Sequence, residues 1–165
     1  MNFNFKKNSF LKNDYYNINI NIMSKSDLQV FRENINKFIE QLSYIYPNDK
    51  ELVIYRDKVV LYGKVDPRGM VEYFMENIGR FTKHIMEKDD AFFLEDLAIK
   101  EVTKNEKYHQ LYDKVRLLWI DGMDEETKKA VWQYFIVFVT LGAKITKNTE
   151  VICIINNYRK QPISL

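Results

Sequence analysis

Four side chains that can bind metal ions or transfer protons lie in one short stretch of the sequence: His84, Asp89, Asp90 and Glu95. A histidine beside carboxylates can ligate a divalent metal ion or form an acid–base pair. Their spacing fits no metal-binding motif. We therefore expect Asp89 and Asp90 to cap the next element while His84 and Glu95 face solvent. The alternative is a small metal-assisted hydrolase centred on these four residues.

The other reactive residue types indicate no second centre. His109 and Asp113 are spaced four apart, as on one helix face, but no third ligand accompanies them. Cys153 lies in the apolar run 151–155, where a thiol is expected to be packed and unreactive. The five glycines match no phosphate-binding loop. The sequence thus predicts no catalytic residue, no bound metal and no cofactor.

Charge separates the body of the chain from its two ends. Residues 1–22 and 144–165 are mildly basic, whereas 23–143 hold 18 basic and 21 acidic residues. Binding to duplex nucleic acid needs a concentrated basic face, so the body is not expected to bind it. A nucleic-acid accessory protein that uses its basic tails is a further alternative. A lone cysteine, no signal peptide and no apolar stretch long enough to span a membrane predict a cytoplasmic location.

The composition and the helical spacing of apolar residues predict an all-α domain. Hydrophobic residues make up 46% of the 165 residues and aromatic residues 15%, enough for a substantial core. Apolar residues recur every three or four positions, which is typical of amphipathic helices. We expect a compact bundle of about five main helices. They run from Ser26 to Pro47, Asn48 to Gly63, Asp66 to Asp89, Tyr108 to Trp119 and Asp124 to Gly142, with a short helix or turn at residues 92–94 that plugs the core.

The last of these helices is expected to be the centre of the bundle. Its segment Val131–Leu141 is apolar almost all round, and such a helix is normally surrounded by others. The second helix shows one apolar series, Leu52, Tyr55, Val59 and Tyr62.

The two ends divide the chain into an Asn-rich arm (1–22), a helical domain (23–143) and a C-terminal extension (144–165). Residues 17–22 alternate strictly between Asn and Ile, which suits either a disordered arm or an edge strand. The β-branched run 151–155 has two interpretations. It is a short strand, pairing with residues 17–22 so that the termini form a small β element, or a closing helix.

Tyrosine content indicates a surface for a protein partner. Eleven tyrosines bring hydroxyl groups that need water or a hydrogen-bond partner, and protein interfaces are enriched in aromatic side chains. The candidates for this surface are Tyr44, Tyr46, Tyr55, Tyr62, Tyr73 and Tyr134. The oligomeric state is left open.

Two segments carry a resemblance to a family. Residues 81–94 combine a basic and apolar helix with an acidic pair and Phe-Phe-Leu, and residues 124–135 combine an acidic cap with paired lysines and Trp-x-Tyr. Together they resemble small helical proteins of nucleocytoplasmic large DNA viruses. This resemblance implies a viral origin and transfers no catalytic residue. The expected function is that of a non-enzymatic protein-interaction or virion-associated protein, in host cytoplasm or virion.

Overall fold

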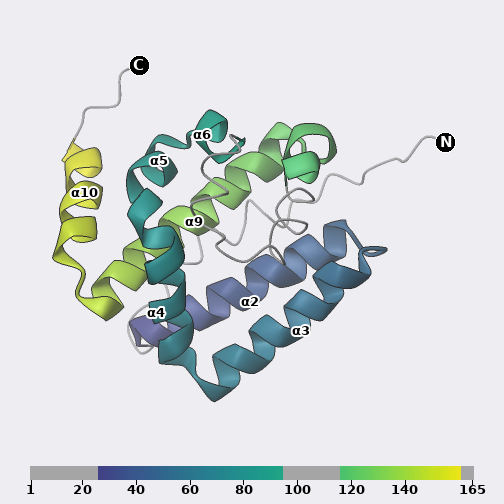
Figure 1. The fold of residues 1–165 in the computed structure, drawn as a ribbon, viewed down its shortest axis with the longest axis horizontal. Helices are drawn as coiled ribbons and strands as arrows, with labels where there is room; N and C mark the ends of the chain where they lie inside the picture. The colour runs from purple at the N-terminus through teal and green to yellow at the C-terminus, as the bar shows by residue number, and fades with distance from the viewer. Residues whose placement is uncertain (1–25, 95–115, 161–165) are drawn as a thin grey trace.

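The computed structural model describes residues 26–94 and 116–160, and these residues form helices without any strand (Figure 1). The long helices are α2 (Asp27–Ile45), α3 (Lys50–Val65), α4 (Pro67–Ile78), α9 (Glu125–Thr146) and α10 (Thr149–Lys160). The shorter elements are the 3-10 turn η1 (Gly79–Phe81), α5 (Thr82–Glu87), α6 (Asp90–Leu94) and the π-helical turn η2 (Leu118–Gly122). The expectation of an all-α bundle is confirmed.

Helix α9 is the element around which the others pack. It contacts α2, α4, α5, η1 and α10, and it crosses the middle of the molecule in Figure 1. No residue from Ala130 to Ala143 is exposed, and Phe138 and Val139 are 1% and 0% exposed. The prediction of a buried central helix is confirmed.

Side-chain caps fix where several helices begin. Ser26 accepts the N–H of Gln29 while the Gln29 side chain accepts the N–H of Ser26, a reciprocal capping box. Asp66 precedes Pro67 and caps α4, and Asp124 caps α9. All three starts agree with the sequence expectation.

Helix α3 differs from the expectation at both ends. Its cap is Asp49, whose carboxylate accepts the N–H of Leu52 at 3.0 Å, so α3 begins after Asp49 instead of after Asn48. The helix also continues past Gly63 to Val65. Gly63 is buried where α3 meets α2 and α4, and a Cβ there would lie 3.0 Å from the Met70 Cε atom. Close packing explains this glycine better than helix termination does.

The third expected helix is divided at Gly79 into α4, η1 and α5. Met75 of α4 lies between two glycines: a Cβ on Gly79 would be 2.9 Å from Met75 Cε, and a Cβ on Gly142 of α9 would be 2.9 Å from Met75 Cγ. The Thr82 hydroxyl donates to the Gly79 carbonyl at 2.5 Å, which satisfies a carbonyl at the break.

The run 151–155 belongs to α10, so the strand interpretation, and with it the β pairing of the termini, is wrong. Lys147, with a positive φ of 56°, ends α9, and α10 then packs against α5 and α9. Val151 and Ile155 join the core. Cys153 lies on the other side of α10 and is exposed, which corrects the expectation of a packed cysteine.

Several expectations lie outside the described residues. They include the Asn-rich arm 1–22, most of the helix expected at 108–119, and Glu95. The expected boundary at residue 143 falls within α9.

Candidate functional site

His84 and Asp89 are brought together by the turn that ends α5. Lys88 adopts a left-handed conformation with φ 54°, and the chain reverses there. The N–H of Asp89 donates to the His84 carbonyl at 3.0 Å. This turn places the Asp89 side chain beside the His84 ring, although the two residues are five apart in sequence.

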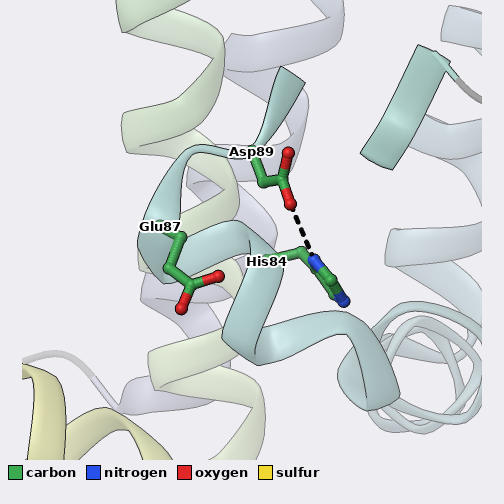
Figure 2. Close-up of side chains that lie close together, drawn as sticks. All are labelled: His84, Glu87 and Asp89. Carbon is green, nitrogen blue, oxygen red and sulfur yellow. Dashed lines mark hydrogen bonds and ion pairs between the residues drawn. The ribbon is translucent and has the colours of Figure 1, made fainter. Parts of the chain in front are cut away.

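A hydrogen bond joins the two side chains. His84 Nδ1 lies 3.0 Å from Asp89 Oδ2 (Figure 2). Because a carboxylate only accepts, Nδ1 carries the proton, and Nε2 at the far side of the ring is left available. Phe92 stacks on the His84 ring at a centroid distance of 3.6 Å and an interplanar angle of 7°, which fixes the plane of the ring.

The same contacts control the charge of Asp89. The hydrogen bond from His84, followed by that from the Phe92 N–H at 3.1 Å, lowers the pKa of Asp89 below its usual value. Both interactions favour the carboxylate over the acid. Asp89 is therefore a cap for α6, as the sequence predicted, and also the partner of His84.

Glu87 completes a group of three possible ligands that the sequence analysis did not include. One ligand atom from each of His84, Glu87 and Asp89 lies within 4.8 Å of the other two (Figure 2). Tyr158 of α10 donates its hydroxyl proton to Glu87, and this contact raises the pKa of Tyr158 to about 12. The spacing of three residues between His84 and Glu87 was the signal available in the sequence.

Asp90, expected in the same group, points elsewhere. Its carboxylate accepts the indole N–H of Trp132 at 2.7 Å and so connects α6 to α9. Trp132 is 6% exposed and Trp119 packs edge-on against it, so these two tryptophans belong to the core. Glu95 lies outside the described residues.

This group can carry out limited chemistry. An aspartate that holds His84 Nδ1–H leaves Nε2 able to accept a proton. Binding of a Zn²⁺ ion by all three side chains would instead require Nδ1, the nitrogen that faces Asp89, to give up its proton, because a metal binds the unprotonated nitrogen. His84 and Asp89 each have 32% of their side-chain surface exposed, and Glu87 is exposed. A hollow of about 610 Å³ lies apart from the group, at residues 45–51.

The six candidate tyrosines divide into two groups. Tyr44, Tyr62 and Tyr73 are exposed. The other three are partly buried: Tyr46 donates to the Gly122 carbonyl, Tyr134 donates to Gln41, and Tyr55 lies beside Lys58.

Two of the exposed tyrosines lie well apart along the bundle. Tyr44 lies at the end of α2 next to the turn into α3, whereas Tyr62 lies about 20 Å further along α3.

Helix α3 exposes an apolar face that the sequence analysis missed. Ile54, Leu61 and Val65 are 52%, 62% and 75% exposed, and their spacing of seven and four residues places them on one side of the helix. Val59 and Gly63 lie on the other side, toward the bundle. We call Ile54, Leu61 and Val65 the outer face of α3.

None of the helices in residues 26–94 and 116–160 combines the length and the apolar character that crossing a bilayer requires. Comparisons of the chain with protein-family models, with curated proteins and with solved structures gave no match. The function must therefore be inferred from the side chains themselves.

Proposed function

We propose that this chain is a non-enzymatic protein-interaction protein that binds its partner through the outer face of α3. The observation that carries the proposal is the exposure of Ile54, Leu61 and Val65 along one side of a single helix. Leu61 and Val65 are neighbours one helical turn apart, whereas Lys58 lies between Ile54 and Leu61. Isolated apolar residues are normal on protein surfaces, and neighbouring exposed ones are more typical of interaction sites. Tyr62 borders this face with 42% exposure and adds an aromatic ring with a polar end.

Among residues 26–94 and 116–160, no other element is packed on this side of helix α3. Its contacts are mainly with α2 and α4, and in Figure 1 it lies at the edge of the described bundle. A partner helix that lies along α3 would cover its apolar side chains in the way that amphipathic helices commonly dock. Viral origin, and a place in the host cytoplasm or virion, belong to the same proposal and rest on the resemblance of residues 81–94 and 124–135.

Differential capture tests the proposal. The tagged full chain is compared with Leu61→Ser and with Val65→Ser in lysates of cells that express the protein. Both substitutions should leave the helical circular dichroism unchanged and remove a captured protein that the wild type retains. Ile120→Ser, which alters another apolar side chain at 49% exposure, and His84→Ala should both keep that protein. An identical capture profile for Leu61→Ser and wild type contradicts the proposal.

A second candidate function is metal-assisted hydrolysis, which the convergence of His84, Glu87 and Asp89 favours. Calorimetric titration of the full chain with Zn²⁺ tests it, with Cys153→Ser as the background because the exposed thiol is another zinc ligand. Binding at one site that His84→Ala abolishes would support a metal centre. Binding that His84→Ala leaves unchanged would remove this candidate.

A further inference from the structure

The outer face of α3 has a defined length and a defined position of charges. Ile54 and Val65 are eleven residues apart, which is about 16 Å or three helical turns. This length suits one short helix. A standard interface between two folded proteins needs about 20–30 residues on each side, far more than this face offers.

Lysines lie within and beside the outer face. Lys58 follows Ile54 by four residues and precedes Leu61 by three, so it lies in the same row, and Lys64 flanks the row at its C-terminal end. Both residues are exposed. Lys58 Nζ also lies 5.7 Å from the centre of the Tyr55 ring.

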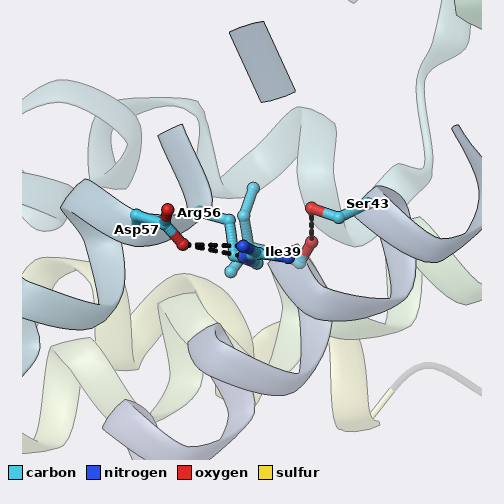
Figure 3. Close-up of polar contacts among 4 residues, drawn as sticks. All are labelled: Ile39, Ser43, Arg56 and Asp57. Atoms are coloured by element: carbon cyan, nitrogen blue, oxygen red, sulfur yellow. Dashed lines mark hydrogen bonds and ion pairs between the residues drawn. The ribbon is translucent and has the colours of Figure 1, made fainter. Parts of the chain in front are cut away.

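The carboxylates of α3 offset these lysines only partly. Asp57 also lies beside Ile54 and Leu61 on this side of α3. It accepts from Arg56 Nε at 3.0 Å and from Nη2 at 2.8 Å (Figure 3), so its charge is paired with that of its neighbour in the helix. Glu51 lies in the first turn, where a negative charge favours the helix dipole. The positive charge therefore prevails in the half of the face around Lys58 and Lys64.

We infer that the outer face of α3 binds an amphipathic helix whose apolar side is flanked by acidic residues. The inference rests on the proposed function and specifies the chemistry of the partner. Carboxylates of the partner would lie against Lys58 and Lys64, and its apolar residues would cover Ile54, Leu61 and Val65. Complementary charge of this kind sets specificity and orientation more than affinity.

A second copy of this chain fits the face less well. A two-fold axis near the middle of the face would pair α3 with α3 in opposite directions and bring the two copies of Lys58 close together. Like charges so placed disfavour association.

Two synthetic helical peptides of 18 residues test the inference. They share apolar residues at the spacing of the outer face, and one carries glutamates where the other carries lysines at the flanking positions. Binding to the full chain is measured by fluorescence anisotropy at low and at physiological salt. We expect the acidic peptide to bind with a Kd of about 100 µM or tighter. The basic peptide should bind at least tenfold more weakly, and salt should weaken the acidic peptide's binding.

Variants of the chain test the charge preference and the apolar contact separately. Lys58→Glu combined with Lys64→Glu should reverse the preference between the peptides. Lys83→Glu, an exposed position on α5, should not change it. Leu61→Ser should weaken both peptides.

Three outcomes would overturn the inference. If both peptides bind equally and Leu61→Ser abolishes both, the acidic partner is wrong while docking on α3 stands. If neither peptide binds, or Leu61→Ser has no effect, the helical occupant is wrong, and the capture experiment alone then judges the proposed function. A concentration-dependent dimer that Leu61→Ser abolishes in sedimentation would identify a second copy of this chain as the occupant.

Discussion

Helices α9 and α3 are both rich in apolar residues, yet the bundle uses them differently. In α9 no residue from Ala130 to Ala143 is exposed, because α2, α4, α5 and α10 pack around it. In α3 nine of the sixteen residues are exposed, and they include the outer face. Apolar content alone therefore does not distinguish a buried helix from an exposed one. The number of helices packed around it decides which of the two it is.

The two helices also differ in what their apolar side chains contact. Phe138 of α9 packs against Phe31, Phe38 and Phe74, with ring centroids 5.6 to 5.8 Å apart. The outer face of α3 meets no such set of rings among the described residues. Substitutions in α9 should thus change stability, and substitutions on the outer face of α3 should change binding.

The largest expected effect is at the crossing of α4 and α9. Gly142→Leu should destabilise the protein by about 3 kcal/mol, because its side chain must displace Met75 from a closely packed site. The measurement is urea unfolding followed by circular dichroism. Met75→Ala in the same chain should recover part of the loss, since the two substitutions act on one contact. If Gly142→Leu leaves the free energy of unfolding unchanged or raises it, α9 is not closely packed against α4 at this position.

A smaller effect is expected where α6 meets α9. Asp90→Ala should cost about 1.5–3 kcal/mol because it leaves the Trp132 N–H without its charged acceptor. Trp132→Phe, measured alone and together with Asp90→Ala, completes a double-mutant cycle. If the two losses simply add, this hydrogen bond does not hold α6 to the central helix.

A still smaller effect on stability is expected from the hydrogen bond between His84 and Asp89. The native pKa of Asp89 is lowered, so this interaction stabilises the native state above the unfolded pKa of about 3.9, and the stabilisation is lost as pH falls through the lower native value. With both side chains about one-third exposed, the contribution should be below about 1 kcal/mol. Asp89→Asn should lose less stability than wild type between pH 6 and pH 3 in urea unfolding. Equal losses would show that the pair contributes nothing.

Local signals in the sequence predicted the elements well. Caps such as Ser26, Asp66 and Asp124 act within one helical turn, so their residues can be read directly from the chain. The continuous apolar character of Val131–Leu141 likewise predicted that other helices surround this segment. The close packing of Gly79 and Gly142 against Met75 was not predictable, because Gly142 is 63 positions away from Gly79.

The candidate site was predictable only in part. The proximity of His84 and Asp89 in sequence suggested a group. Glu87 joins it through its helical spacing from His84 on α5, whereas the left-handed turn at Lys88 places Asp89 beside the ring, and Asp90 instead contacts Trp132. The outer face of α3 was missed for a different reason. Apolar residues occur on both sides of that helix, and only the positions of α2 and α4 show which side is covered.

The most direct test of this account is a matched pair of valine truncations. Val139 of α9 is 0% exposed and Val65 of α3 is 75% exposed, so Val139→Ala and Val65→Ala make the same chemical change in the two environments. In urea unfolding, Val139→Ala should lose about 2 kcal/mol, whereas Val65→Ala should stay within about 0.5 kcal/mol of wild type. Equal losses at the two positions would contradict the distinction between the buried helix α9 and the exposed outer face of α3.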